Sequence, residues 1–492
     1  METVYAAFER TAQRYGHKPF LHPPGFTYSE CLEKINDIAR RYEARGYGAG
    51  QRVALLLPSG PDFLFHFLAL NSLGASIVPL NPEYRQAERD YILSHSEAGL
   101  VVTRELLEGE FNPPPARDTT GSGECALLYT SGTTGKPKGC LLSDFYFLNV
   151  ARRYLSLGNL CTVREGEERL ITPLPLFHMN ALAVSTTVMI LSAGCVIQLE
   201  RFHPKTWWRE VVESGATIVH YLGVMPAILL GLPQDSAERA HHVRFGFGAN
   251  ANPKDHAAFE ERFGFPLVES WAMTETGGGA MITACREPRH VGTRCFGSPP
   301  PELEVRIDEK SSELLVRQKG DGPRRGFFSG YYKDAEATEH AWRDGWFHTG
   351  DAVRRGPDGQ LHFVDRLKNI IRRSGENIAA AEIEAVLQAH DAVAQVAVLA
   401  VPDELREEEV MACIVPMPGQ AGDARLADTL FAWAYDKLAY YKAPGWVLFL
   451  DRLPTTGTQK VQKAQIFPAG SDPRAHPGAL DLRARKKRRQ AA

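Results

Sequence analysis

The sequence predicts an α/β protein, with a large N-terminal domain of several subdomains on parallel sheets and a small α+β domain after it. Two observations predict this division. Short apolar runs that favour β-strands alternate with helix-patterned segments well past Ile218. The pattern changes near Asp365, and a chain of 492 residues exceeds one ordinary domain.

The N-terminal part has the pattern of βαβ units. Strands are expected at residues 51–59, 75–81 and 99–103, and residues 61–74 between the first two have a helical period. A strand, helix and strand recur over residues 195–222. Since a helix that joins two strands is typical of a parallel crossover, these segments predict parallel sheets.

The C-terminal part is compact and ends in a basic segment. Its expected helices and strands are residues 380–390, 393–403, 410–417 and 425–438. With the boundary at Leu367 to Asn369, the domains are 1–367 and 368–470. Residues 471–492 are polar and finally basic, which predicts a disordered tail; the alternative is a tether to nucleic acid or a membrane.

Composition excludes several functions. The formal charge is −3, from 56 basic and 59 acidic residues, so nothing global favours nucleic acid and a small substrate is expected. No apolar stretch is long enough for a membrane span, and the amphipathic N-terminus is no signal peptide. The eight cysteines are scattered without metal-ligand spacing, which predicts a reducing cytoplasm. A homodimer stays open.

Residues 127–143 read "LLYTSGTTGKPKGCLLS", a dense group of hydroxyls, glycines and lysines. Hydroxyls and lysines donate to oxygen, and glycines let the backbone approach, so a phosphate chain is the expected ligand. Pro137 stands where a Walker loop needs a hydroxyl, which excludes that motif. The structural alternative is a polar hairpin whose lysines, Lys136 and Lys138, are solvated.

The segment "YTSGTTGKPKG" resembles the signature loop of the adenylate-forming superfamily, which includes acyl-CoA synthetases, firefly luciferase and the adenylation domains of peptide synthetases. Further matches follow in order: "PLPLFHMNAL", "FGAN", "WAMTETG", "WFHTGDAV", "VDRLKNIIRRSGENI" and "LPTTGTQKVQK". The resemblance implies a mobile C-terminal domain and an ATP-dependent ligase of the fatty-acid–CoA ligase type. Its cofactors would be ATP, Mg²⁺ and coenzyme A, and its substrate a carboxylic acid.

The resemblance also implies a nucleotide site. Phosphates would be held by Thr130, Ser131, Gly132, Thr133, Thr134 and Lys138. Trp271, where the family usually has tyrosine, would pack on the adenine, and Gly248, Ala249 and Asn250 would lie along it. Thr274 would contact the α-phosphate, and Glu275 would bind magnesium. Asp351 would hold the ribose with Arg366. Its alternative role is to form a turn after the preceding glycine.

Catalysis and domain movement are implied for the C-terminal part. Lys460 would bridge the carboxylate and the α-phosphate, with Lys463 as its rival. Lys368 would be the hinge about which the small domain turns between two half-reactions. Gly375 in "RRSGENI" would then admit the pantetheine arm, unless it is only the glycine that approaches the next helix.

The acyl pocket is implied at His178, Tyr221, Leu222, Gly223, Gly277 and Gly278. His178 could instead be a packed or capping residue. Three successive glycines, 277–279, are expected to leave volume, which favours a bulky, branched or aromatic acid. The candidate residues include no lysine or arginine, which disfavours a dicarboxylate.

Three other functions stay open on the sequence. A stand-alone adenylating enzyme would load the phosphopantetheine of a carrier protein. A luciferase-like oxygenase would use the adenylate differently. A lapsed member would only bind ligands, although Lys460, Glu275 and Asp351 are retained.

Overall fold

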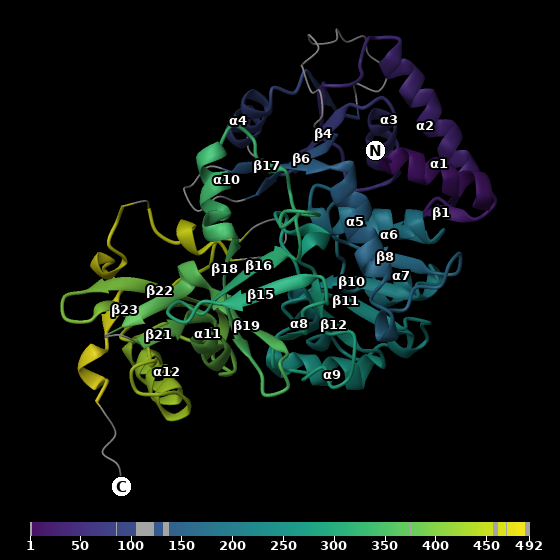
Figure 1. Cartoon of the computed structure of the whole chain (residues 1–492). Coiled ribbons are helices and arrows are strands. Elements are labelled where there is room, and N and C mark those ends of the chain that lie inside the picture. Colours follow the sequence, from purple (N-terminus) through teal and green to yellow (C-terminus); the bar gives the residue numbers. More distant parts are fainter. Residues whose placement is uncertain are drawn as a thin grey trace. The chain divides into compact units, whose positions relative to one another are not determined.

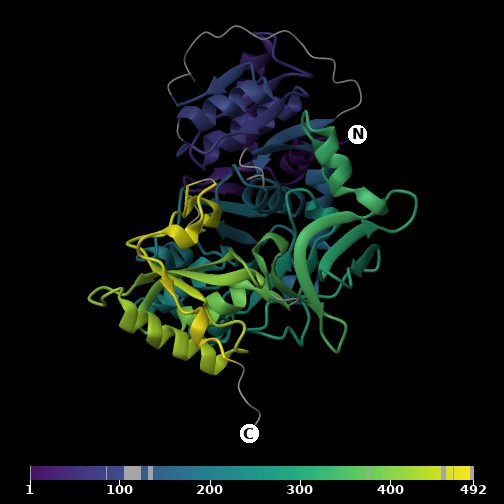
Figure 2. The same ribbon diagram turned by 90° about the vertical axis from the view of Figure 1, so that its left-hand side faces the viewer.

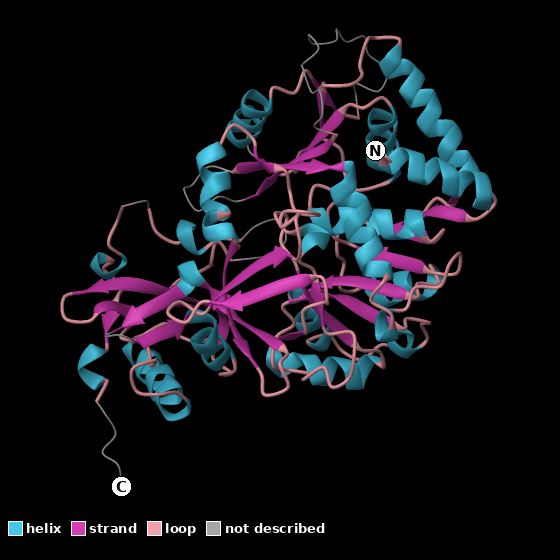
Figure 3. Cartoon of the chain, in the orientation of Figure 1, coloured by secondary structure: helices cyan, strands magenta, loops and turns pink. Residues whose placement is uncertain are grey.

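The computed structural model describes residues 2–84, 86–104, 123–130, 137–373, 376–455, 461–468 and 470–487. The chain forms two compact units (Figures 1 and 2). Unit 1 consists of Met1–Arg306, Leu315–His348 and Arg355–His362; unit 2 consists of Ile307–Leu314, Thr349–Arg354 and Phe363–Ala492. Helices and strands alternate along most of the described chain (Figure 3).

A six-stranded sheet in unit 1 has the order β17-β7-β6-β4-β3-β5. Its strands are β3 (Arg52–Leu55), β4 (Ser76–Pro79), β5 (Leu100–Val102), β6 (Glu124–Thr130), β7 (Lys138–Ser143) and β17 (Gly330–Tyr331). Strand β3 pairs in parallel with β4 and β5, and α3 (Pro61–Ser72) connects β3 to β4. The predicted parallel crossover is confirmed.

An eight-stranded sheet in unit 1 has the order β13-β12-β11-β10-β8-β9-β1-β2. Its strands are β1 (Pro19–His22), β2 (Phe26–Thr27), β8 (Arg169–Thr172), β9 (Cys195–Gln198), β10 (Ile218–Leu222), β11 (Phe245–Ala249), β12 (Leu267–Trp271) and β13 (Ile282–Thr283). Strands β9 and β10 are separated by β8, which pairs in parallel with both. The two consecutive strands expected over residues 195–222 are therefore not neighbours in the sheet.

Helices cover both faces of this sheet, as the near-continuous apolar strands require. The helices of unit 1 are α1 (Val4–Tyr15), α2 (Tyr28–Glu43), α3, α4 (Gln86–Ser96), α5 (Asp144–Leu155), α6 (Thr186–Leu191), α7 (Trp207–Glu213), α8 (Val224–Leu230), α9 (Pro253–Phe263) and α10 (Ala335–Ala341). Residues of α7, α8 and α9 form one core with β10 and β12. On the other face Tyr154 of α5 packs 4.5 Å from Phe247 of β11, between ring centroids.

Local sequence explains where these helices begin. Thr27 and Glu30 form a capping box at the start of α2, each side chain accepting from the other's backbone amide. Asn252 caps α9, and Pro253 follows at its first position. Helix α3 is apolar on nearly all sides and is buried from Phe63 to Asn71, which fits its place between the sheet and α2.

A five-stranded sheet contributes residues to both units and has the order β14-β19-β18-β16-β15. Its strands are β14 (Cys295–Gly297), β15 (Leu303–Ile307), β16 (Glu313–Gln318), β18 (Phe347–Arg355) and β19 (Leu361–Arg366). Strands β18 and β19 carry two of the predicted site residues, Asp351 and Arg366.

The main sheet of unit 2 has the order β21-β20-β23-β24-β25, and β22 also pairs with β23. The elements are β20 (Ile370–Arg373), β21 (Glu376–Ala379), α11 (Ala380–Gln388), β22 (Val393–Asp403), β23 (Glu407–Pro416), α12 (Ala424–Lys437), β24 (Trp446–Phe449) and β25 (Leu480–Asp481). Side chains of α11 and α12 form one core with β22 and β23. The predicted α/β fold class, with a small α+β part at the C-terminal end, is confirmed.

The prediction of a disordered tail at 471–492 differs from the structure up to Lys487. Strand β25 pairs with β24, Leu482 is buried in the core of unit 2, and the amide of Leu482 donates to the carbonyl of Gly445 at 2.8 Å. Composition concealed this because most of the segment is polar and apolar packing anchors it at few residues, Leu480 and Leu482 among them. Residues 488–492 lie outside the described residues.

Within the described residues, no helix is long and apolar enough to cross a membrane. All eight cysteines lie in the described part of the chain, are buried and form no disulfide there.

Candidate active site

The signature loop connects two antiparallel strands. Thr130 ends β6 and pairs with Lys138, the first residue of β7. The Thr130 hydroxyl lies 3.9 Å from the sulfur of Cys140. The phosphate-binding candidates Ser131, Gly132, Thr133 and Thr134 lie outside the described residues.

Tyr331 connects the end of this loop with the predicted magnesium ligand. Its hydroxyl donates to Oε1 of the buried Glu275 at 2.9 Å. Lys138 Nζ lies 5.0 Å from the centroid of the Tyr331 ring and 3.4 Å from Asp334 Oδ2. The sequence analysis gave Tyr331 no role; the structure makes it a partner of Glu275.

The segment from Trp271 to Glu275 is fixed from several sides. Trp271 ends β12, is 7% exposed and packs 6.0 Å from Phe296, between ring centroids. The Tyr146 hydroxyl of α5 donates to the Thr274 carbonyl at 2.8 Å. The Glu275 carbonyl accepts from the amide of residue 328 at 2.9 Å.

Glu269 is a site-supporting residue that sequence reasoning missed. Its Oε1 accepts from the Tyr221 hydroxyl at 2.8 Å and the Ala251 amide at 3.0 Å, and its Oε2 accepts from the Asn250 amide at 2.8 Å. Burial raises the pKa of this carboxyl. Asn250 has a φ of 64°, so the carboxylate stabilises a left-handed turn directly after Gly248 and Ala249. The available signal was one acid in the apolar strand "LVESW".

Two expectations for the acyl pocket are wrong. The Tyr221 side chain is fully buried in the core with α7, α8 and α9, so it forms no open wall. The three glycines of η5 (Gly277–Gly279) leave no empty volume: added Cβ atoms would lie 2.2 Å from the Tyr146 ring, 2.6 Å from Val150 Cα and 2.5 Å from the Phe327 ring. The glycines admit close packing and give no reason to expect a bulky acid.

The remaining pocket candidates lie near chain turns. Leu222 ends β10, and Gly223 leads into α8. The His178 side chain keeps access to solvent, yet its surroundings desolvate it enough to lower its pKa to about 4. Its ring meets that of Phe177 at 4.8 Å and 62°. At neutral pH His178 is therefore uncharged.

The π-helix η3 (Asn180–Ser185) follows His178 and is anchored by a buried histidine. His220 Nδ1 lies 2.8 Å from the Ser185 hydroxyl, and its Nε2 lies 3.2 Å from the Tyr154 hydroxyl. Burial lowers the pKa of His220 to about 3. Because π-helical turns are rare and often adjoin functional sites, this anchor is consistent with a constrained pocket segment.

Asp351 and Arg366 form an ion pair in unit 2. Asp351 is 1% exposed, and its Oδ1 lies 2.8 Å from Arg366 Nε. The Thr349 hydroxyl accepts from the Asp351 amide at 3.1 Å and donates to the Leu314 carbonyl at 2.7 Å. Since Asp351 lies inside β18, it is not a simple turn former.

The predicted hinge is tied to Asp365. Lys368 lies in the short helix η7 (Leu367–Asn369), where burial and the nearby Arg366 lower its pKa. Asp365 accepts from the Arg366 amide at 2.7 Å, from Asn369 Nδ2 at 3.1 Å and from the Ala381 amide at 2.8 Å. This buried carboxylate, not predicted to have a role, links the hinge to the start of α11.

Lys460 and Gly375 lie outside the described residues. Lys463 Nζ pairs with Glu384 Oε1 at 2.7 Å. This ion pair gives the positive charge of Lys463 a structural role. Strand β21 lies between Gly375 and α11, so Gly375 does not directly precede the helix.

Metal-binding capacity is limited in the described part of the chain, which has no group of three His, Cys, Asp or Glu residues able to hold an ion. Magnesium nevertheless often binds through one or two carboxylates together with substrate phosphates. A single carboxylate such as Glu275 fits that mode.

Comparisons with known proteins match both parts of the chain. The model described as AMP-binding enzyme matches residues 8–121 and 105–332, and the AMP-binding enzyme C-terminal domain matches residues 382–460. Feruloyl-CoA synthase of Amycolatopsis sp is 32% identical over 89% of this chain and 93% of its own. Crotonobetaine/carnitine–CoA ligase of Proteus mirabilis is 29% identical, covering 90% and 93%. Sulfoacetate–CoA ligase of Cupriavidus necator is 30% identical, covering 95% and 97%.

Solved structures share the fold over nearly the whole chain. ATP-bound MatB from Rhodopseudomonas palustris has a TM-score of 0.79 at 24% identity and covers 94% of this chain and 98% of its own. o-Succinylbenzoate CoA synthetase (MenE) from Bacillus subtilis, in complex with an acyl-adenylate, has a TM-score of 0.80 at 24% identity and covers 96% and 99%. The resemblance inferred from the motifs is confirmed: the chain belongs to the AMP-binding enzyme family and is an adenylate-forming ligase of the acyl-CoA ligase type.

Proposed function

We propose that this ligase joins a monocarboxylic acid to coenzyme A in two steps. A carboxylate oxygen attacks the α-phosphorus of ATP, and pyrophosphate leaves. The thiol sulfur of coenzyme A then attacks the acyl carbonyl, and AMP leaves. The names of the relatives favour coenzyme A as acceptor, because all three are named as CoA ligases or synthases. Each of them is matched over at least 93% of its length.

The observation that carries the proposal is the Asp351–Arg366 pair. A carboxylate accepts from both ribose hydroxyls at once, and a guanidinium 2.8 Å from Oδ1 orients Asp351. We propose that these two residues hold the ribose. Trp271 would supply the aromatic face for the adenine, with Gly248, Ala249 and Asn250 on the turn that Glu269 stabilises.

Magnesium would neutralise charge on the phosphates, and Glu275 would be its protein ligand. The Tyr331 hydroxyl donates to Oε1 of Glu275 and so orients the carboxylate without cancelling its charge. Thr274 would contact the α-phosphate. Thr130, Ser131, Gly132, Thr133, Thr134 and Lys138 would hold the other phosphates.

Unit 2 would supply the parts that change between steps. We propose that Lys460 shields the attacking carboxylate from the α-phosphate during adenylation. Lys368 would be the hinge, and the Gly375 region would pass the pantetheine arm in the thioester step.

The acid is expected to carry no second negative charge. Among the pocket candidates, Leu222, Gly223, Gly277 and Gly278 are uncharged, and His178 is neutral at pH 7 because its pKa is about 4. A second carboxylate would thus find no cation among them. Monocarboxylic acids therefore remain the candidates, and the fatty acids among them would be in keeping with a role in fatty acid metabolism.

Cellular setting and assembly remain predictions. The reducing cytoplasm is supported by the eight cysteines, which form no disulfide within the described residues. A homodimer would be tested by sedimentation velocity of the full chain.

The function is tested by pyrophosphate release from ATP and Mg²⁺ with octanoate, benzoate, ferulate, acetate and malonate, each with and without coenzyme A. The expected result is release with a monocarboxylate and a thioester only when coenzyme A is present. A thioester formed only on a phosphopantetheinylated carrier protein would favour that acceptor. Oxygen uptake or light would favour the oxygenase, and no acid-dependent release would contradict the proposal.

A further inference from the structure

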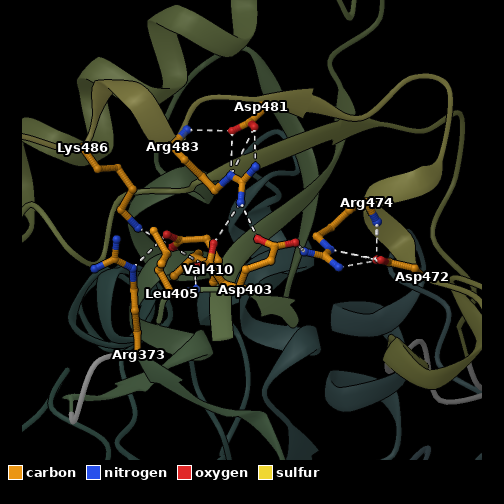
Figure 4. Close-up of polar contacts among 11 residues, drawn as sticks. Arg373, Asp403, Leu405, Val410, Asp472, Arg474, Asp481, Arg483 and Lys486 are labelled. Carbon is orange, nitrogen blue, oxygen red and sulfur yellow. Dashed lines mark hydrogen bonds and ion pairs between the residues drawn. The ribbon is translucent and has the colours of Figure 1, made fainter. Parts of the chain in front are cut away.

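Three charged side chains meet in the interior of unit 2 (Figure 4). Glu409 Oε2 accepts from Arg373 Nε at 2.8 Å, and Glu409 Oε1 accepts from Lys486 Nζ at 2.5 Å. The side chain of Glu409 is 0% exposed, that of Arg373 is 2% exposed and that of Lys486 is 1% exposed. Lys486 Nζ also donates to the Tyr441 carbonyl at 2.9 Å.

Such a cluster is a costly way to stabilise a fold. Buried charges lose their hydration, and apolar side chains of similar size often stabilise as well or better. The site holds two cations and one carboxylate, so one positive charge is uncompensated within the triad. The burial of Lys486 lowers its pKa to about 8, which reflects that cost.

Lys486 belongs to a segment that we call the strap, Leu480–Lys487. The strap is held along its length: β25 pairs with β24, and Arg483 Nη1 lies 3.0 Å from Asp403 Oδ2. The Tyr435 hydroxyl donates to the Lys487 carbonyl at 2.5 Å. The strap lies beyond residue 460, where the C-terminal family match ends.

At its other end the cluster reaches the hairpin formed by β20 and β21. Arg373 is the last residue of β20 and pairs across the hairpin with Glu376. The backbone of the hairpin has a second tie, because the amide of Arg372 donates to Glu408 Oε2 at 2.6 Å. Consecutive glutamates of β23 therefore fix consecutive arginines of β20.

We propose that Lys486 and Glu409 are positioning residues for the thioester step, in which the strap holds Glu409, Glu409 holds Arg373, and Arg373 sets the place of the β20–β21 hairpin. This inference rests on the proposed function, in which the hairpin that contains Gly375 presents the path of the pantetheine arm. A displacement of about 1 Å at a reacting centre costs about 100-fold in rate. The cluster thus lowers the stability of the fold but fixes the position of the hairpin for the thioester step.

The test compares Lys486→Met with Lys487→Met in the full-length chain. Lys486→Met should stay folded, because Glu409 keeps Arg373 as its cation and no buried charge is left alone. Lys487 is the exposed neighbour and serves as the matched control. Each half-reaction is measured with ATP, the acid found active in the screen, and varied coenzyme A.

We expect Lys486→Met to lower kcat/KM for coenzyme A about tenfold, with pyrophosphate release within twofold of the parent. Hydrogen exchange in residues 370–379 should become faster in Lys486→Met and stay unchanged in Lys487→Met. Parent rates in both steps together with unchanged exchange would overturn the inference. Equal losses in both steps with a lowered melting temperature would also overturn it, because they indicate a merely structural role.

The proposed function is tested separately by the parent. If the parent releases pyrophosphate but makes no thioester with coenzyme A, the proposed acceptor is wrong whatever the variants do. Exchange at residues 370–379 needs no substrate, so it still shows whether Lys486 orders the hairpin.

Discussion

Two pairs of carboxylates, one pair in each unit, are held in opposite ways. In unit 1, Glu275 and Glu269 are held by neutral donors: tyrosine hydroxyls and backbone amides. In unit 2, Asp351 and Glu409 are held by cations. Neutral donors orient a carboxylate and leave its charge for a ligand, whereas a cation consumes the charge to fix geometry. Under the proposed function, Glu275 thus keeps its charge for magnesium, whereas the cations fix Asp351 and Glu409 in place.

Buried bases extend the contrast. In unit 1, burial lowers the pKa of His66 to about 4 and of His220 to about 3, so both are neutral at pH 7. In unit 2, Lys486 is buried beside Arg373 and Glu409. Acid should therefore lower the free energy of unfolding through the histidines of unit 1. Base should raise it through Lys486 of unit 2.

The largest expected effect is the acid sensitivity of unit 1. His66 and His220 titrate near 6.5 when unfolded, so their contribution is full above that pH and is lost as pH falls towards 4. Between pH 7 and pH 5 these two histidines should together lower the unfolding free energy by about 4 kcal/mol, roughly 2 kcal/mol from each. Urea unfolding at both pH values measures it.

His66→Phe provides the control for the acid effect. It removes one titrating group, so its loss of unfolding free energy between pH 7 and pH 5 should be about 2 kcal/mol smaller than that of the parent. A loss equal to the parent's would exclude His66 as a source.

Lys460→Ala should slow adenylation by about 100-fold or more, corresponding to about 3 kcal/mol in the barrier, since it removes the charge that shields the carboxylate. Lys463→Ala is the control, because Lys463 pairs with Glu384. Thioester formation from supplied acyl-adenylate should survive in both. If Lys463→Ala gives the larger loss of pyrophosphate release, the catalytic assignment passes to Lys463.

The next effect is the change of stability at alkaline pH, which depends on Lys486. Its folded pKa of about 8 is below the ordinary 10.5, so its favourable contribution is fully present above 10.5 and is lost as pH falls through 8. Burial and the cations of Arg373 and Arg406 lower this pKa, whereas the carboxylate of Glu409 raises it. Relative to Lys486→Met, the parent should gain about 2 kcal/mol of unfolding free energy between pH 8 and 9.5. A constant difference between the two proteins would contradict this.

The smallest expected effect is that of a neutral donor. Tyr331→Phe removes one hydrogen bond to Glu275 and should cost about 1 kcal/mol, seen as a few-fold rise in the magnesium concentration needed for half-maximal rate. Tyr332→Phe is a neighbouring control, because its hydroxyl donates to Glu97 instead. A loss as large as that of Lys460→Ala would break the comparison between the units.

Sequence predicted what depends on local pattern. Strand β22 was expected at residues 393–403 and is found there, because its apolar residues and β-branched valines mark it locally. The role of Glu269 could not be predicted, since it depends on the parallel register that places β12 beside β11. The glycines 277–279 misled for the same reason: only the fold brings Tyr146, Val150 and Phe327 against them.

The strap has a consequence for biosynthesis. Lys486 lies 77 positions after Glu409, so a growing chain carries the Arg373–Glu409 pair long before the lysine that also pairs with Glu409 has been translated. Until then β24 lacks its neighbour β25, and the core lacks Leu482. Chaperone contacts with the nascent enzyme should thus persist until these residues emerge. A shortened chain cut at residue 460, where the family match ends, would resemble that unfinished state permanently.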